Sequence, residues 1–425
     1  MIIPNYAFIL VSPNNPLGIA FPNRLNLKNN TLPIVAGHNN QYKGYLLKKD
    51  VINIKETYPI RFKKIDNYYK AGPLVGILTT RDAKGFKGNK NNYIDLILMG
   101  IKTGVLVYVF TAESLDKQNR TVEGYLYLPT NGTWQKKKMP LPDVVYNRIP
   151  SRKEEKRIII NETVNYLEKE HIPYFNHYFF DKVTLYKWMS KTKEFDRFIP
   201  DTRSLTIENL RKMLDTYHMI YLKPVHGKAG IGFIKIEKKD NIYFLTYQGS
   251  KITQRKTLDS FNLLWKDIIS LINKKNYIIQ RGINLKEYHS YPFDIRILVQ
   301  KNGEGIWKVS GIGIRVAGAR SITTHVPRGG YIEMPFKVFN YSFGKKANDW
   351  EDAISKLTIE MAKHIEKRSE KNLGELSLDL GIDKENNLWF FEANSKPMKF
   401  DEPNIRYTSL LRLMQYFRFL TGFTD

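Results

Sequence analysis

Acidic and amide side chains interrupt two apolar runs near the end of the sequence. Asp379 lies in the run 376–383, and Glu392 and Asn394 lie in the run 388–394, with a four-residue turn between the runs. In an antiparallel hairpin Asp379 can lie near Glu392, and Glu392 and Asn394 face the same side. Such carboxylates would repel unless a cation joined them, and oxygen ligands without His or Cys favour Mg²⁺ shared with substrate phosphates. The alternative is that they face water at strand ends; we favour the metal site because carboxylates are rarely placed in strands this apolar without a partner.

A lysine followed by a glycine-rich loop forms the second candidate site. The sequence Tyr-Leu-Lys-Pro ends at Pro224, and the loop after it contains Gly227, Lys228, Gly230 and Gly232 before an apolar run resumes. Glycines let backbone N–H groups approach an anion, and Lys223 can meet phosphate charge. The spacing matches neither the Walker nor the dinucleotide pattern, both of which need a helix after the loop. The alternative is an ordinary glycine-rich hairpin.

The third candidate site consists of arginines in the run 293–299 and at the end of the run 311–315. Period two places Asp294 and Arg296 on one face of a strand whose other face is apolar. A guanidinium there suits a phosphate or a carboxylate, and Arg315, beside glycines that leave room for a ligand, is in the same position. A solvated ladder of ion pairs is the alternative.

Composition limits the kinds of protein that the chain can be. It has 425 residues, of which 42% are hydrophobic and 13% aromatic, so a buried core is expected and long disorder is excluded. The formal charge of +25 implies an acidic partner. The absence of cysteine excludes disulfides, thiolate metal sites and Cys nucleophiles. With no secretory pattern at the start and no apolar tract of about 20 residues, we expect a soluble, cytoplasmic protein.

These residues need several elements to position them, and the pattern predicts three domains. Short β-like runs at 7–11, 45–47 and 51–54 indicate a small β-rich domain over residues 1–68. In residues 69–150, strands at 74–78 and 105–110 flank a helix near 93–101, which predicts a βαβ unit with parallel strands, followed by a strand at 144–146. Residues 151–425 then combine helices at 153–171, 350–368 and 405–420 with β-rich blocks at 220–236 and 277–316 and the strands at 376–381 and 388–393.

The order of these motifs resembles that of the ATP-grasp superfamily over residues 175–400. The whole chain, with Val-Tyr-Asn-Arg at 145–148 and Leu-Trp-Phe-Phe-Glu-Ala-Asn-Ser-Lys-Pro at 388–397, more narrowly resembles the YheC/YheD-like endospore coat-associated ATP-grasp proteins. The resemblance implies an α+β or α/β chain: an ATP-grasp domain preceded by a βαβ pre-ATP-grasp domain and the small N-terminal β domain.

The resemblance also implies roles for residues at matching positions. Lys182 and Lys223 resemble the nucleotide-binding lysines, and residues 227–232 the phosphate loop, with Gly227, Lys228, Gly230 and Gly232. Gln280, Arg281, Gly282 and Ile283 resemble the hinge that meets adenine, and Glu287 is the expected ribose-binding acid. Arg296 and Arg315 resemble the catalytic arginines that hold phosphate, and Asp379, Glu392 and Asn394 the magnesium ligands. Residues 324–330 resemble the acceptor-side loop. Arg281 stands where many relatives carry Glu, which leaves the hinge side chain open.

By this resemblance the chain is expected to be an ATP-dependent carboxylate–amine ligase that uses ATP and Mg²⁺, with Mn²⁺ as an alternative metal. A carboxylate would attack the γ-phosphorus of ATP, and the acyl phosphate would then meet an amine. The basic charge favours an acidic peptide or polymer as acceptor, on charge alone.

Two further classes stay open: a spore-coat structural or assembly protein that binds ATP without turnover, and a nucleic-acid binder, for which only non-specific attraction is expected because no recognition motif appears. We expect His226, His289 and His325 to be structural or solvated, since none shows metal-ligand spacing.

Overall fold

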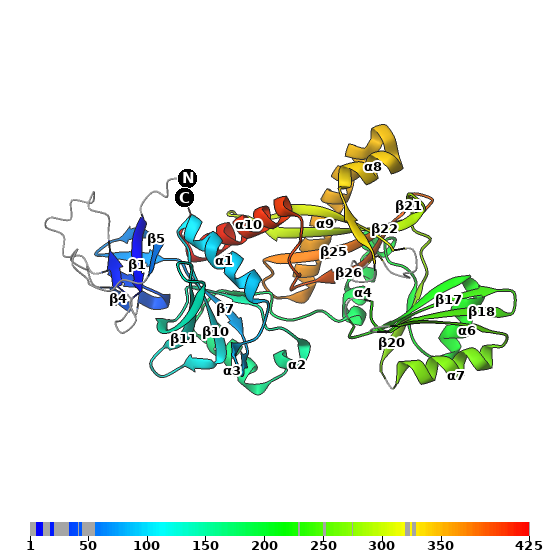
Figure 1. The fold of residues 1–425 in the computed structure, drawn as a ribbon, viewed down its shortest axis with the longest axis horizontal. Coiled ribbons are helices and arrows are strands. Elements are labelled where there is room, and N and C mark those ends of the chain that lie inside the picture. Colours follow the sequence, from blue (N-terminus) through cyan, green and yellow to red (C-terminus); the bar gives the residue numbers. More distant parts are fainter. Residues whose placement is uncertain are drawn as a thin grey trace.

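The structure is a computed structural model, and it shows an α+β fold with four main sheets (Figure 1). It describes most of the chain, namely residues 6–11, 18–20, 34–40, 42–44, 56–227, 230–249, 252–273, 275–318, 324 and 329–424.

The first sheet is built from the N-terminal part of the chain and has the strand order β2-β1-β5-β6-β3-β4. Its strands are β1 (Tyr6–Val11), β2 (Gly18–Ala20), β3 (Ile34–Ala36), β4 (Tyr42–Gly44), β5 (Glu56–Ile65) and β6 (Tyr68–Gly72). The strand predicted at 7–11 is present, whereas those predicted at 45–47 and 51–54 lie outside the described residues. β6 begins at residue 68, where we placed a domain boundary; that boundary stays a prediction.

The second sheet contains the βαβ unit. β7 (Leu74–Thr79) is buried along its whole length and pairs in parallel with β10 (Leu106–Asp116), which confirms the parallel pairing. Between them, α1 (Lys90–Thr103) begins where the Asn89 side chain accepts a hydrogen bond from Asn92 N, and ends at the left-handed Gly104. The sheet is completed by β11 (Thr121–Leu128), β12 (Thr133–Pro140), β13 (Val144–Asn147) and β14 (Tyr174–Phe175); Arg81–Asp82 (β8) and Gly85–Phe86 (β9) form a small hairpin.

The single helix predicted over 153–171 is wrong, because the structure has two helices there. α2 (Arg152–Glu155) is followed by α3 (Ile158–Lys169). The break falls at Arg157, whose backbone is extended and whose guanidinium pairs with Glu113 Oε1 at 2.8 Å and Glu154 Oε2 at 3.0 Å. The apolar residues that set the helical spacing, Ile158, Ile159, Val164 and Leu167, all lie in α3, so the pattern does not reveal the break before them.

The third sheet lies at the opposite end of the molecule from the first (Figure 1). It has the order β15-β20-β16-β17-β18-β19, and α6 (Ile207–Thr216) and α7 (Phe261–Ile272) pack on it through an apolar core. Its strands are β15 (Thr202–Ser204), β16 (Met219–Pro224), β17 (Phe233–Lys239), β18 (Ile242–Gln248), β19 (Thr253–Leu258) and β20 (Tyr277–Arg281). α4 (Lys182–Ser190) and α5 (Lys193–Asp196) lead into it.

The fourth sheet is antiparallel and lies between the second and third sheets (Figure 1). One face is apolar and packs on α8 (Pro335–Phe343) and α9 (Ala347–Ser369), while α10 (Pro403–Thr421) joins the core that covers the second sheet. The other face carries Asp294 and Arg296, as period two predicts. The strands are β21 (Glu287–Tyr288), β22 (Tyr291–Lys301), β23 (Trp307–Val316), β24 (Tyr331–Glu333), β25 (Glu375–Ile382) and β26 (Leu388–Asn394). In the described part of the chain, no helix is both long and apolar enough to cross a membrane.

Candidate functional site

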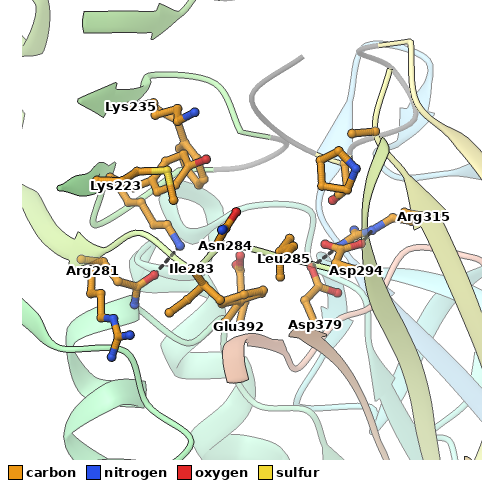
Figure 2. Close-up of a pocket in the computed structure, with 18 of the residues that line it drawn as sticks. Lys223, Lys235, Arg281, Ile283, Asn284, Leu285, Asp294, Arg315, Asp379 and Glu392 are labelled. Carbon is orange, nitrogen blue, oxygen red and sulfur yellow. Dashed lines mark hydrogen bonds and ion pairs between the residues drawn. The ribbon is translucent and has the colours of Figure 1, made fainter. Parts of the chain in front are cut away.

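A cavity of about 270 Å³ opens between the third and fourth sheets and brings most of the predicted site residues together (Figure 2). From the third sheet, β16, β17 and β20 contribute side chains; from the fourth, β22, β23, β25 and β26 do so, and α4 adds Lys182. Charged groups of both signs line it: Lys182, Lys223, Lys235, Arg281, Arg315, Glu287, Asp294, Asp379 and Glu392.

Lys223 projects into the cavity from the end of β16. Its Nζ donates a hydrogen bond to Gln280 Oε1 on the neighbouring strand, and Gln280 Nε2 donates to Thr202 Oγ1 at 2.9 Å. Burial, together with the nearby Lys182, lowers the pKa of Lys223 to about 7, against the opposing effect of Glu392 and Asp379. The fixed lysine is therefore placed to gain a full charge when an anion enters.

Arg315 on β23 joins two carboxylates in the other wall. It pairs with both oxygens of Asp294, through Nε at 2.8 Å and Nη2 at 2.6 Å, and with Asp379 Oδ2 at 2.9 Å. Burial lowers the pKa of Arg315, but the two carboxylates outweigh burial and raise it above its ordinary value. Its Nη1 is buried and has no hydrogen-bond partner among the described residues, so one donor is left for an anionic ligand.

Asp379 and Glu392 face each other across the hairpin of β25 and β26, as predicted from the sequence. Glu392 Oε2 pairs with Lys182 Nζ at 2.8 Å. Lys182 is the first residue of α4, and Asp181 caps that helix by accepting a hydrogen bond from Thr184 N at 2.9 Å. Lys182 and Arg315 thus balance the negative charges of the two carboxylates of the hairpin in this structure.

The donor set at the hairpin fits a hard cation that also binds phosphate. It offers carboxylate oxygens with no His or Cys, which suits Mg²⁺, and Mg²⁺ commonly binds through one or two carboxylates plus substrate phosphates. Asn394 lies opposite Ser377 and is not among the residues that line the cavity. No group of three His, Cys, Asp or Glu residues that could hold a metal occurs among the described residues, so this site would need ligand oxygens from a substrate.

The glycine loop between β16 and β17 is held at its ends by backbone that only glycine adopts easily. Gly230 and Gly232 have φ values of +67° and +84°. A Cβ on Gly232 would lie 2.9 Å from Tyr277 Oη, which donates a hydrogen bond to Gly232 O. A Cβ on Gly227 would lie 2.8 Å from Pro224 Cγ. Lys228 lies outside the described residues.

The segment after β20 runs along the same wall. Gln280, Arg281 and Ile283 line the cavity, and Gly282 N donates to Met219 O at 2.8 Å. The Arg281 guanidinium lies over the ring of Trp389, 5.0 Å from its centroid. Glu287 lines the rim of the cavity and pairs with Lys384 at 2.9 Å; its predicted contact with ribose stays a prediction.

Some predicted residues lie away from this cavity. Arg296 does not line it, and its guanidinium lies over the ring of Phe400, 5.4 Å from the centroid. His226 borders a different cavity, and His289 packs against Tyr288 and Tyr341. Thr324 of the acceptor-side loop does line the cavity, whereas residues 325–328, including His325, lie outside the described residues.

Several residues that line the cavity were not predicted from the sequence. They include Met219, Tyr221, Phe233, Lys235 and Phe391, which form much of the apolar wall and add one cation. Period two could have found four of them, since Met219 and Tyr221 share a face with Lys223, and Phe233 with Lys235.

The chain is similar to known proteins in sequence and in fold. Residues 171–420 match the family described as YheC/D like ATP-grasp. The chain is 30% identical over 381 residues to the endospore coat-associated protein YheD of Bacillus subtilis, covering 85% of this chain and 81% of that protein. It is 24% identical to YheC of the same organism, over 69% of this chain and 81% of that one. Among solved structures, D-alanyl-alanine synthetase A from Vibrio cholerae is similar at a TM-score of 0.49 and 12% identity, covering 83% of this chain and 98% of that one.

Proposed function

Because the chain belongs to the YheC/D like ATP-grasp family, we propose that it is an ATP-dependent ligase that joins a carboxylate to an amine through an acyl phosphate. The observation that carries the proposal is the cavity itself, because the cations Lys182, Lys223 and Arg315 line the same space as the carboxylates Asp379 and Glu392. Cations that hold phosphate beside carboxylates that hold Mg²⁺ are what phosphoryl transfer needs.

In the proposed reaction a substrate carboxylate oxygen attacks the γ-phosphorus of ATP. The bond between the γ-phosphorus and the β–γ bridging oxygen breaks, and ADP leaves. The amine nitrogen then attacks the acyl carbon, the C–O bond breaks, phosphate leaves and the amine releases a proton. When bound, Mg²⁺ would neutralise phosphate charge, held by Asp379 and Glu392.

The side chains have separate roles in this proposal. Lys223 and Lys182 bind phosphate oxygens, and Arg315 Nη1, which has no hydrogen-bond partner among the described residues, donates to the transferring group. Gln280 fixes Lys223, and residues 281–283 hold the adenine. Arg296 and Asn394, which do not line the cavity, would reach the substrates only if the sheets closed on them.

Trapping of the acyl phosphate tests this proposal. The protein is incubated with ATP, Mg²⁺, hydroxylamine and a glutamate-rich peptide, and both ADP and the peptide hydroxamate are measured. We expect both products in equal amounts, and neither with the Glu392→Gln variant. Hydroxamate formation without ADP, or ADP formation that no carboxylate stimulates, would contradict the ligase.

A second function is favoured by the two Bacillus subtilis relatives, YheD and YheC, which are endospore coat-associated proteins. In this alternative the protein takes part in assembly of the spore coat and binds ATP without turnover. ATP binding with no ADP release in the presence of any carboxylate and amine would support it over the ligase.

A further inference from the structure

A second cavity, of about 750 Å³, lies on the other side of the segment that begins α4. α2 and the residue after it contribute Arg152, Lys153, Glu155 and Lys156, and α3 contributes Asn161. The segment before α4 contributes Tyr178, Phe179 and Asp181, and the glycine loop contributes His226. We call this second cavity the α2 cavity. We infer that the α2 cavity binds an acidic peptide and presents it to the ATP site, an inference that rests on the proposed function.

The charge that the α2 cavity offers to a ligand is positive. Its two carboxylates are already engaged: Glu155 pairs with the buried Lys396 and accepts a hydrogen bond from Phe179 N at 3.2 Å, and Asp181 caps α4. Lys153 and Lys156 are exposed, and neither takes part in an ion pair within the described residues. Two free lysines thus lie at the rim of the cavity, as far as the described part of the chain shows.

Arg152 adds a donor that no described protein group uses. Its Nη2 donates to Phe180 O, and its guanidinium lies over the ring of Phe179 at 5.3 Å, while its Nε is buried with no hydrogen-bond partner among the described residues. A buried N–H without an acceptor is costly, so a ligand carboxylate that reached this N–H would offset that cost.

The α2 cavity adjoins the cavity between the third and fourth sheets, where we propose that ATP binds. Asp181 lines the first and Lys182 the second. The strand that carries Glu392 continues into Ser395, whose Oγ donates to Tyr178 O at 2.5 Å, and into Lys396, which pairs with Glu155. A chain bound in the α2 cavity therefore lies next to the segment that carries Lys182 of the cavity between the third and fourth sheets.

The size and chemistry of the cavity favour a peptide with several carboxylates. A space of about 750 Å³ lies within the range of pockets that hold drug-sized ligands and has room for more than a single amino acid. A guanidinium and two lysines match carboxylates spaced along a chain, and Phe179 offers an apolar surface for the methylene groups between them. A peptide, rather than a phosphate polymer, also supplies the carboxylate that the proposed reaction activates.

The test compares binding of a fluorescent ten-residue polyglutamate peptide to full-length variants by anisotropy at constant ionic strength. Lys153→Gln/Lys156→Gln removes two charges at the cavity rim. Lys345→Gln/Lys346→Gln removes two exposed, adjacent lysines next to α9 and leaves the same net charge. We expect the rim variant to bind the peptide at least tenfold more weakly and the control variant to stay within twofold of the wild type.

Three outcomes would overturn the inference: no peptide binding by the wild type, an equal loss in both double variants, or tighter binding of poly(glycerol phosphate) than of polyglutamate with the same dependence on Lys153 and Lys156. ATP titration of the wild type in the same buffer distinguishes a failure of the peptide-site inference from a failure of the proposed ligase function. If Mg²⁺-dependent ATP binding persists, only the peptide site fails; if it is absent, the proposed function fails whatever the peptide does.

Discussion

Arg315 is the residue on which the charge balance of the candidate site depends. It is buried between Asp294 and Asp379 and contacts both, so its loss would leave two buried carboxylates without their cation. Such a loss is more costly than removal of a complete pair, because the remaining charge must be desolvated alone.

We expect Arg315→Met to lower the free energy of unfolding by about 3–5 kcal/mol. The double variant Arg315→Met/Asp294→Asn should recover part of this loss, since one of the two carboxylates becomes neutral. Urea denaturation of the wild type and both variants measures the effect. A loss of less than about 1 kcal/mol in the single variant would show that the carboxylates find other partners or water.

Lys223 gives the site a dependence on pH. Its pKa of about 7 in the nucleotide-free protein means that it loses its proton as the pH rises through 7. If Lys223 binds phosphate as proposed, phosphate binds its protonated form, and nucleotide binding then takes up a proton at and above that pH. With a pKa near 7, the charged fraction falls about tenfold between pH 6 and pH 8.

We therefore expect ATP affinity to fall by about tenfold between pH 6 and pH 8 because of Lys223. Ionisation of ATP itself contributes to the observed dependence and is measured with Lys223→Met, in which the contribution of the lysine is absent. Calorimetry in buffers of different ionisation enthalpy gives the proton uptake directly. The same pH profile in the wild type and in Lys223→Met would contradict this assignment.

At the scale of elements, the glycine loop depends on backbone that other residues adopt only with strain. Gly232 combines a left-handed backbone with the close approach of Tyr277. Gly344, between α8 and α9, has a positive φ of +53°, but no described atom lies within 4 Å of the place that a Cβ would take. A comparison of substitutions at the two glycines therefore distinguishes the effect of backbone strain from that of crowding at the loop.

We expect Gly232→Ala and Gly344→Ala each to lose about 1–3 kcal/mol of stability, because the backbone of both residues has a positive φ. Only Gly232→Ala should also weaken ATP binding, because the added methyl group displaces Tyr277 and the loop that we propose to bind the phosphates. Thermal unfolding and ATP titration of both variants test this. Equal ATP affinity in the two variants would remove the loop from the binding site.

The elements that the sequence predicts well are those with strong local periodicity. The hairpin of β25 and β26 was predicted because apolar residues alternate with Asp379 and Glu392, and its register confirms that these two lie opposite each other. α6 and α7 were missed although their signals are present: Thr206 and Ser260 cap them, and Leu264, Ile268 and Ile272 recur at helical spacing.

Long-range pairings could not be predicted from the sequence. Period two places Asp294 and Arg296 on the same face of β22, but only the register with β23 makes Asp294 the partner of Arg315. That register includes an irregularity between Leu298 and Val299. Arg296 was expected at the phosphates, yet Phe400, more than 100 positions later, packs against it.

At the scale of the whole molecule, a buried polar cluster joins the second sheet to the fourth. Glu375 on β25 accepts hydrogen bonds from Tyr146 Oη and from Gln300 Nε2, the latter at 3.1 Å, and pairs with Arg148 at 3.3 Å. Burial raises the pKa of Glu375, against the opposing effect of Arg148 and Tyr146. Arg148 also donates to Pro397 O at 3.0 Å, so the cluster reaches the segment that follows β26.

We expect Glu375→Ala to destabilise the protein by about 3–5 kcal/mol, because it leaves Arg148 buried without its carboxylate. Glu375→Gln should cost less, since its amide oxygen can still accept from Tyr146. Urea denaturation, followed by tryptophan fluorescence, compares the two. Equal effects of the two substitutions would mean that the hydrogen bonds to residue 375 do not help to hold the sheets together.

Calorimetric titration of ATP, with and without Mg²⁺, is the measurement that shows whether this cavity binds Mg²⁺–ATP. The proteins are the wild type, Glu392→Gln and Glu360→Gln. Glu360→Gln is the control, because the Glu360 side chain is exposed on α9. We predict binding that requires Mg²⁺, weakened at least tenfold in Glu392→Gln and unchanged in Glu360→Gln. A folded wild type that binds no ATP, or that binds it equally in all three proteins with and without Mg²⁺, would contradict the assignment of this cavity as a Mg²⁺–ATP site.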